Sequence, residues 1–172
     1  MIAQYVIRKA ETRDLAALPA IERAAAVLFS EEELPPHRRD VTVPYEDLAS
    51  AQSDGRLWVA CDGDDRAVGF ALADRFEDGA YLDEIDVHPD HGRRGLGTRM
   101  IAAVIEWARN EGFQSLYLDT SRHVPWNMPY YERVGFREVK DDAIPQELRA
   151  IMQQTYEEGF DPAQRVAMMM AL

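Results

Sequence analysis

The sequence predicts a single α/β domain in which helices flank one mixed, mostly antiparallel sheet. Its 172 residues fit one domain, since single domains cluster at roughly 100–200 residues. Three short apolar runs joined by turn sequences indicate an antiparallel meander, and the strand, helix and strand that follow indicate one parallel pair. With 47% apolar residues the chain can build a sizeable core, so we expect residues 1–172 to form one domain.

The N-terminal third combines one strand with helices. Residues 5–8 predict a short strand, and residues 12–29 predict a helix, because apolar side chains recur there at spacings of three and four. Pro19 should bend or split this helix, since proline removes a backbone donor. Residues 30–44, rich in Pro and charge, indicate a loop, and residues 45–52 indicate a second helix.

Three strands are predicted in the middle of the chain, at residues 57–61, 67–74 and 80–87. Turn sequences separate them at residues 62–65 and 77–79. We therefore expect these strands to pair with one another in antiparallel fashion.

A crossover helix and five further elements complete the expected fold. The helix at residues 98–110 leads to a strand at 115–119, which should lie parallel to the strand before the helix. The remaining elements are a short helix at residues 129–133, a strand at 136–139, a helix at 145–158 and a strand at 165–172. The last strand is apolar on both faces, as expected when both sides of a sheet are covered.

The net charge of −12 disfavours partners that bind through phosphate groups. Non-specific binding to nucleic acid or to an anionic membrane requires an excess of Lys and Arg, whereas this chain has 31 Asp and Glu against 19 Lys and Arg. We expect no nucleic acid and no membrane as partner. A cationic partner is expected instead, and acidic surface that only maintains solubility is the alternative.

The composition also indicates a cytoplasmic protein. Residues 1–10 lack the apolar stretch of a signal peptide, and no run approaches the roughly 20 apolar residues of a membrane span. The single cysteine, Cys61, excludes an intrachain disulfide. Its place in a strand-like run predicts a buried structural thiol.

A glycine-bearing turn before the crossover helix is suited to an anionic ligand. Residues 88–98 read His-Pro-Asp-His-Gly-Arg-Arg-Gly-Leu-Gly-Thr. Glycines let backbone N–H groups approach a ligand, and a helix N-terminus adds the positive end of a dipole. The turn lacks the Lys-Ser or Lys-Thr of a Walker loop and the Gly-x-Gly-x-x-Gly of a dinucleotide site. It predicts a phosphate or pyrophosphate site, with a plain tight turn as the alternative.

Two segments resemble the motifs of the GNAT-type N-acetyltransferases. Residues 87–97 are similar to the family's Val-x-Pro followed by Arg/Gln-x-x-Gly-x-Gly/Ala, and residues 127–136 are similar to its Asn followed by aromatic-Tyr-x-x-x-Gly-Phe. The resemblance covers about residues 57–139, with an extra helix and strand at 145–172. It implies a GNAT-like fold and acetyl-CoA as the acetyl donor. One departure is Gly92, which stands where the family has Arg or Gln, so the role of Arg93 is open.

The resemblance assigns roles to two side chains. Tyr131 matches the family's general acid, which protonates the leaving thiolate, and Tyr130 is then left to packing. A core aromatic is the alternative for Tyr131. Glu84 matches the position of a base that acts through water, and alternation puts Asp86 on the same side of the strand. Asp86 as the base, and a carboxylate that only binds the ammonium, are the alternatives.

The resemblance also implies a set of cofactor contacts. The backbone N–H of Val87 is the expected partner of the thioester carbonyl. Asn127 is expected to bind pantetheine or to cap the short helix, and both can hold at once. The family usually bulges the strand before the turn near its end, which would disturb alternation beyond Ile85. The residues expected to contact the cofactor are Ile85, Val87, Arg93, Arg94, Gly95, Leu96, Gly97, Thr98, Asn127 and Tyr131. No metal is expected, because the histidines lack ligand spacing.

The predicted function is transfer of an acetyl group from acetyl-CoA to a primary amine by direct attack in a ternary complex. In this family the acceptor site is usually shaped by segments that correspond here to residues 29–44 and 140–162, and acidic residues there suit a small cationic molecule. Trp126 and His123 either line the acceptor pocket or are structural. The added helix could cover the pocket, pack on the core or form a homodimer contact. Two alternative functions remain, a non-catalytic acyl-CoA-binding or sensor protein and a protein or peptide N-acetyltransferase.

Overall fold

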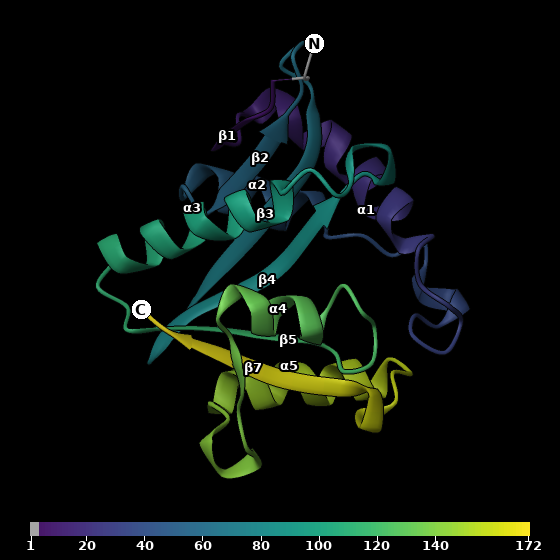
Figure 1. Cartoon of the computed structure of the whole chain (residues 1–172), viewed down its shortest axis with the longest axis vertical. Coiled ribbons are helices and arrows are strands. Elements are labelled where there is room, and N and C mark those ends of the chain that lie inside the picture. The colour runs from purple at the N-terminus through teal and green to yellow at the C-terminus, as the bar shows by residue number, and fades with distance from the viewer. Residues whose placement is uncertain (1–3) are drawn as a thin grey trace.

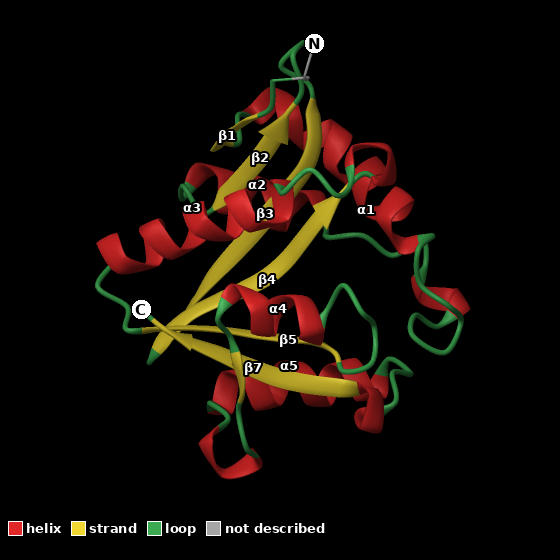
Figure 2. Cartoon of the chain, in the orientation of Figure 1, coloured by secondary structure: helices red, strands yellow, loops and turns green. Residues whose placement is uncertain are grey.

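One seven-stranded sheet runs through the molecule in the order β1-β2-β3-β4-β5-β7-β6 (Figure 1). All neighbouring strands are antiparallel except β4 and β5, which are parallel. Helices cover the sheet on both faces, so the predicted fold class is confirmed (Figure 2). The computed structural model describes residues 4–172. Residues 1–3 lie outside the residues that the structure describes. They belong to the segment of residues 1–10, in which the sequence predicts no signal peptide.

Each predicted strand and helix is present. The strands are β1 Val6–Lys9, β2 Leu57–Cys61, β3 Ala67–Phe76, β4 Gly79–Val87, β5 Ser115–Ser121, β6 Arg137–Glu138 and β7 Arg165–Ala171. The α-helices are α1 Leu18–Ala26, α2 Tyr45–Ser53, α3 Leu96–Asn110, α4 Met128–Val134 and α5 Gln146–Glu157. Pro19 splits the first helical segment as expected: a 3-10 helix at Thr12–Ala17 precedes it, and Pro19 lies in the first turn of α1, where no backbone donor is needed.

The two faces of the sheet carry separate cores. Helices α3 and α4 cover one face, where Met100, Trp107 and Phe136 are buried against Trp58. Helices α1, α2 and α5 cover the other face. The buried thiol of Cys61 belongs to this second face, and burial raises its pKa to about 11, which confirms a structural role for the cysteine. Strand β7 has buried residues on both faces, as predicted.

A bulge at Asp83 decides which face the next residues of β4 occupy. Leu82 pairs with Ala73 and Glu84 pairs with Leu72, so Asp83 is an extra residue in β4. The family resemblance implies a bulge near the end of the strand, which would disturb alternation beyond Ile85. This expected position of the bulge is wrong. Because the bulge comes earlier, alternation resumes at Glu84 and turns this side chain toward α1 and away from the core under α3.

The sheet forks between β4 and β5. Their parallel pairing is confined to Ala80 with Leu116 and Tyr81 with Tyr117, although β4 continues to Val87 and β5 to Ser121. In Figure 1 the two strands diverge beyond this point. The bulge strengthens the local twist of β4 and so contributes to the separation. The fork leaves a gap in the sheet that the remaining elements surround.

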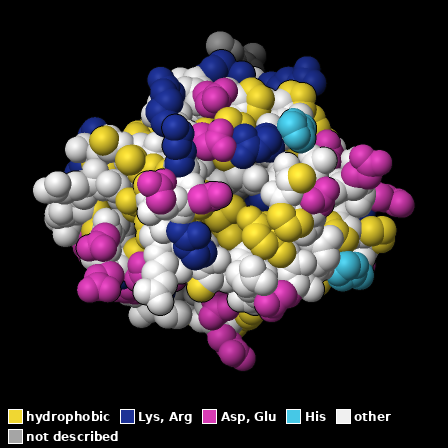
Figure 3. Space-filling view, turned by 90° about the horizontal axis from the view of Figure 1, so that it is seen from below, with side chains coloured by type: hydrophobic (Ala, Val, Ile, Leu, Met, Phe, Trp, Pro, Cys, Tyr) yellow, Lys and Arg dark blue, Asp and Glu magenta, His cyan; other side chains and the backbone are white. Residues whose placement is uncertain are grey.

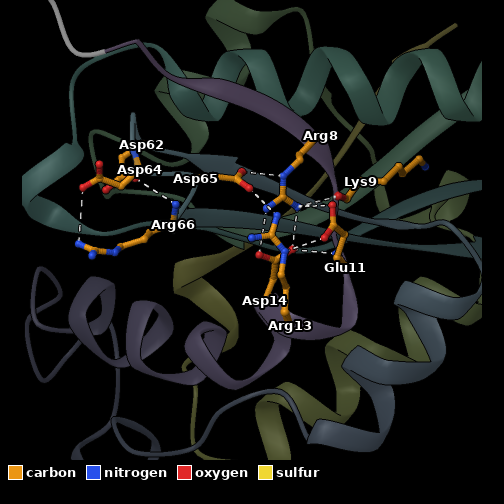
Figure 4. Close-up of polar contacts among 9 residues, drawn as sticks. All are labelled: Arg8, Lys9, Glu11, Arg13, Asp14, Asp62, Asp64, Asp65 and Arg66. Carbon is orange, nitrogen blue, oxygen red and sulfur yellow. Dashed lines mark hydrogen bonds and ion pairs between the residues drawn. The ribbon is translucent and has the colours of Figure 1, made fainter.

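Charged side chains are also abundant away from the fork. Figure 3 shows Asp and Glu scattered over one face of the molecule, with some Lys and Arg among them. Figure 4 shows a network in which Arg8 donates to Asp14 at 2.7 Å and to Asp65 at 3.1 Å, while Arg13 pairs with Asp65 and Glu11. This network joins β1 to the turn between β2 and β3.

Candidate active site in the fork of the sheet

A cavity of about 360 Å³ lies in the fork between β4 and β5. Its walls come from α1 and the loop after it, from β4 and β5, and from the start of α4, the end of α5 and Arg165 of β7. Five of the predicted site residues line it, namely Glu84, Ile85, Asp86, Asn127 and Tyr131. Val87, the last residue of β4, and the glycine turn that follows it lie outside the lining.

Three carboxylates meet in this cavity. Oxygen atoms of Glu22, Glu84 and Asp86 all lie within 4.8 Å of one another. Glu84 and Asp86 point toward α1 because of the bulge, and Glu22 faces them from α1. Sequence analysis missed Glu22. A signal was present, since Glu22 follows the buried Ile21 and lies four residues after the buried Leu18, close to the apolar face of the helix.

Burial makes these three carboxyl groups weak acids. Burial raises the pKa of Glu84 well above its ordinary value, and the nearby Asp86 and Glu22 raise it further. The same causes, burial and then Glu22, raise the pKa of Asp86 to about 8. Burial also raises the pKa of Glu22, although the N–H of Val43 donates to this carboxylate at 2.9 Å and opposes the shift. A group with a pKa near 8, such as Asp86, can both give up and take up a proton near neutral pH.

Tyr131 lies across the cavity on α4. It is only 8% exposed, packs edge-on against Phe136 at 5.7 Å between ring centres, and lines the cavity. Its hydroxyl has no hydrogen-bond partner within residues 4–172. Burial, with smaller contributions from Tyr130 and Glu84, raises the pKa of Tyr131 well above its ordinary value. The hydroxyl therefore keeps its proton and is able to donate it.

The adjacent Tyr130 points to a different place. Its hydroxyl lies 2.9 Å from Oγ1 of Thr98 at the start of α3. A Cβ atom on Gly97 would lie 3.3 Å from the same hydroxyl. Tyr130 thus packs against the glycine turn, as the family resemblance implies, while Tyr131 faces the cavity, and the role of Tyr131 stays a prediction.

The glycine turn presents free backbone donors. Gly95 caps α3 with a φ of +74°, and Arg93 before it has a φ of +58°. The first N–H groups of α3 have no partner within the helix, and its first turn contains no acidic residue. Arg94 lies 5.7 Å from the ring centre of Tyr5. At Gly92, a Cβ atom would lie only 3.2 Å from the carbonyl oxygen of Pro89, which accounts for a glycine at this departure from the family motif.

The backbone of β4 also offers donors toward the fork. The N–H of His88 donates to the carbonyl oxygen of Val68 in β3 at 2.8 Å. In an antiparallel pair the N–H groups of successive residues point alternately toward and away from the neighbour. The N–H groups of Val87 and Ile85 therefore point away from β3, toward the side from which β5 has separated.

Asn127 immediately precedes α4 and lines the cavity. Its side chain makes no capping hydrogen bond, so the capping alternative is wrong. Its backbone carbonyl accepts from the N–H of Tyr131 at 2.9 Å, as the first turn of a helix requires. The side-chain amide is left for the cavity.

Two segments expected to shape the acceptor site meet over the cavity. Arg38, in the loop after α1, pairs with Glu158 after α5 at 3.0 Å, and Nε2 of His37 lies 2.8 Å from the carbonyl oxygen of Glu158. Both Arg38 and Glu158 line the cavity. Trp126 packs against Phe29 at 5.8 Å between ring centres but lies outside the lining, as does His123.

Asp119 is a further carboxylate in the lining that sequence analysis missed. The hydroxyl of Tyr81 donates to one of its oxygens at 2.8 Å, and Arg165 pairs with the other at 2.5 Å. The charge of Asp119 is thus neutralised within the protein. In contrast, no ion pair reaches Glu22, Glu84 or Asp86 from any of the described residues.

A metal site is not expected from the sequence, and this stays a prediction. The group of Glu22, Glu84 and Asp86 contains no histidine or cysteine. Among the helices of residues 4–172, none has the length and apolar character needed to cross a membrane.

A model of the Acetyltransferase (GNAT) family matches residues 18–136, more than half of the chain. The chain belongs to the GNAT family. It is 32% identical over 87 residues to the [ribosomal protein bS18]-alanine N-acetyltransferase of Salmonella typhimurium, a match that covers 51% of this chain and 59% of that protein. The chain spans about half the length of the curated relatives it matches.

Solved structures of GNAT proteins share the fold. The PaiA N-acetyltransferase of Thermoplasma acidophilum, in complex with coenzyme A, superposes with a TM-score of 0.73 at 17% identity, covering 98% of this chain and 99% of that one. The N-acetylglutamate synthase of Neisseria gonorrhoeae, complexed with coenzyme A and N-acetyl-glutamate, gives a TM-score of 0.72 at 20% identity, covering 100% of this chain and 36% of that one. The GNAT resemblance in the sequence is confirmed, whereas the roles of individual site residues stay predictions.

Proposed function

We propose that the chain is an acetyl-CoA-dependent N-acetyltransferase that acetylates a primary amine of a small cationic molecule. One observation carries the proposal: carboxylates that lack an ion-pair partner and the hydroxyl of Tyr131 line one cavity in the fork, beside the N–H groups of β4 that point away from β3. Within the GNAT family this combination supplies a proton acceptor, a proton donor and a donor for a carbonyl oxygen. Transfer of an acetyl group from a thioester to an amine requires these three groups.

The transfer is a direct attack within a ternary complex. The acceptor enters as an ammonium and loses one proton to a carboxylate, for which Glu84 is the first candidate and Asp86 the second. The nitrogen lone pair then forms a bond to the thioester carbon, while the N–H of Val87 holds the carbonyl oxygen. The carbon–sulfur bond breaks, and Tyr131 donates its proton to the departing thiolate. The proton that the nitrogen loses as it becomes an amide nitrogen restores the hydroxyl of Tyr131.

The glycine turn supports binding of the acetyl-CoA pyrophosphate. The N–H groups of Gly95, Leu96, Gly97 and Thr98 are free to bind oxygen atoms, and Leu96 contributes its backbone alone because its side chain is buried. Arg93 and Arg94 are exposed beside this turn and add positive charge. Ile85 through its N–H, and Asn127 through its side chain, are proposed contacts for the pantetheine arm.

The covered cavity favours a small acceptor over a protein. The contacts of Arg38 and His37 with Glu158 close one side of the cavity, and a peptide chain needs an open groove. A protein or peptide acceptor is the second candidate, because a relative at 32% identity is named for acetylating a ribosomal protein. A cytoplasmic location and a homodimer stay predictions.

The proposal is tested by acetyl-CoA-dependent release of free thiol across a panel of polyamines, aminoglycosides, amino acids and peptide N-termini. We expect turnover with cationic small amines and little with neutral or acidic ones. Preferential turnover of peptides would favour the protein-modifying alternative. Tight binding of coenzyme A without turnover of any amine would overturn the enzyme proposal in favour of an acyl-CoA sensor.

A further inference from the structure

Glu22 adds a third carboxylate to the pair on β4, and the arrangement of the three suits one chemical group. Their oxygens come from two elements, α1 and β4, and all lie within 4.8 Å of one another. The Glu22 side chain is held in place, because its carboxylate accepts the N–H of Val43 at 2.9 Å. The three oxygens are therefore positioned by the fold and do not belong to a mobile surface.

A primary ammonium has three N–H donors in a tetrahedral arrangement. A nitrogen that donates along three such bonds of about 2.9 Å holds the acceptor oxygens about 4.7 Å apart. The oxygens of the cluster all lie within 4.8 Å of one another, so one nitrogen is able to reach all three. A secondary ammonium has two N–H donors and a tertiary ammonium has one, so neither can satisfy all three oxygens.

The surrounding charges leave the cluster available to a cation. Arg38 faces the cavity but pairs with Glu158, and Arg165 pairs with Asp119. Glu33 and Asp83 line the same cavity and add negative charge. The hydroxyl of Tyr131, a side chain more than nine-tenths buried, also faces the cavity without a partner among the described residues. The cavity thus contains carboxylates that no cation of the described residues pairs with, together with a hydroxyl donor.

We propose that Glu22, Glu84 and Asp86 form a three-point site for a primary ammonium and that Glu22 makes the protein specific for primary amines. The inference rests on the proposed function, since it concerns the acceptor cavity of that reaction. Glu22 contributes binding and orientation. One of the β4 carboxylates takes the proton, an N–H bond breaks and an O–H bond forms, and the neutral nitrogen is left facing the thioester.

The site implies that binding of the amine releases protons from the protein. Without a cation, the three partly buried carboxylates repel one another, and the pKa of Asp86 is raised to about 8, so this group retains a proton near neutral pH. An ammonium among them favours the ionised forms, so protons leave as the amine binds. A purely structural role of Glu22 would not produce such a release.

The experiment compares two diamines of the same length and charge. Binding of 1,4-diaminobutane and of its N,N,N′,N′-tetramethyl derivative to the full chain with coenzyme A is measured by calorimetry in buffers of different ionisation enthalpy. We expect Glu22→Gln to weaken binding of 1,4-diaminobutane by about tenfold or more, because a charge-assisted hydrogen bond is lost. The same variant should release fewer protons and leave binding of the tetramethyl derivative and of coenzyme A unchanged.

The matched control is Glu31→Gln, which makes the same change of charge at an exposed residue outside the cavity. Equal losses in both variants, or no loss in Glu22→Gln, would overturn the proposal. Displacement of the diamine by excess CaCl₂ would identify a divalent-cation site and overturn it as well. Wild-type binding of 1,4-diaminobutane with these Glu22 effects but without acetylation of any amine would reject the proposed function and leave the ammonium site standing.

Discussion

At the scale of single residues, the environment of a side chain decides its chemistry. Tyr130 and Tyr131 are neighbours in the chain, yet one contacts Thr98 and the other faces the cavity. Likewise, Asp119 is neutralised by Arg165, whereas Asp86 is buried without a cation among the described residues. The sequence shows that these residues are present, but their ionisation depends on neighbours that come from other elements.

The two adjacent tyrosines provide a matched pair of variants. We expect Tyr131→Phe to lower kcat by about 100-fold or more, because a general acid commonly contributes a factor of this size, with little change in the affinity for coenzyme A. Tyr130→Phe loses the contact with Thr98 and should mainly raise KM for acetyl-CoA. Steady-state kinetics on both variants measures this difference, and unchanged kcat in Tyr131→Phe would remove Tyr131 from the mechanism.

The buried carboxylates should make the protein less stable as the pH rises. The folded-state pKa of Asp86 is raised from 3.8 to about 8, so its contribution to stability is complete below about pH 4 and is lost as the pH rises through about 8. The effect of Asp86→Asn on the free energy of unfolding should therefore depend on pH. We expect this effect to be more stabilising at pH 8 than at pH 5, by at least about 1 kcal/mol. Urea unfolding at both pH values measures this, with the exposed Asp40→Asn as control. Parallel pH profiles for wild type and Asp86→Asn would contradict the expectation.

At the scale of elements, periodicity predicts which segments are helices and strands, but not where one strand changes face. The alternation in 80–87 predicts a strand and places Glu84 and Asp86 together, and both are confirmed. The extra residue at Asp83 is invisible to this reasoning, since a bulge is defined by the register with β3. Glu22 was missed for a similar reason, because its neighbours on β4 are distant in sequence and are brought close only by the packing of α1.

The turn before α3 is a second element whose backbone adopts an unusual conformation. Gly95 has a φ of +74°, and an L side chain in this region costs about 1–2 kcal/mol. We therefore expect Gly95→Ala to lower the free energy of unfolding by about 1 kcal/mol and to weaken binding of coenzyme A, as measured by urea unfolding and calorimetry. Gly95→Asn is the matched variant, since Asn tolerates a positive φ better. Equal losses for both variants would show that the φ angle is not the cause.

At the scale of the whole molecule, the cavity in the fork depends on contacts between distant parts of the chain. The loop after α1 and the segment after α5 are joined by Arg38 and Glu158. Sequence analysis predicts that both segments shape the acceptor site, but their contact with each other could not be predicted, since neither segment has a pattern that fixes its path. The GNAT motifs identify the family and the glycine turn, whereas the proposed acceptor site is lined partly by segments that the motifs do not describe.

The contact between Arg38 and Glu158 should affect the acceptor more than the cofactor. We expect Arg38→Ala to raise KM for a small amine severalfold, while KM for acetyl-CoA stays the same. Because both side chains are partly exposed, at 27% and 30%, the pair itself should stabilise the fold by no more than about 1 kcal/mol. Kinetics of Arg38→Ala, Glu158→Ala and the double variant test this, since additive effects on the acceptor KM would show that the two residues do not act as a pair.

The fork also has a mechanical consequence for the molecule. Strands β4 and β5 pair only at Ala80 with Leu116 and at Tyr81 with Tyr117. Few strand-to-strand contacts therefore join the part of the sheet formed by β1 to β4 to the part formed by β5, β7 and β6. In the proposed reaction the donor and the acceptor bind in the fork, between β4 and β5, and contact both halves. We therefore expect the two halves to be held together more firmly when ligands are bound than when the products have left.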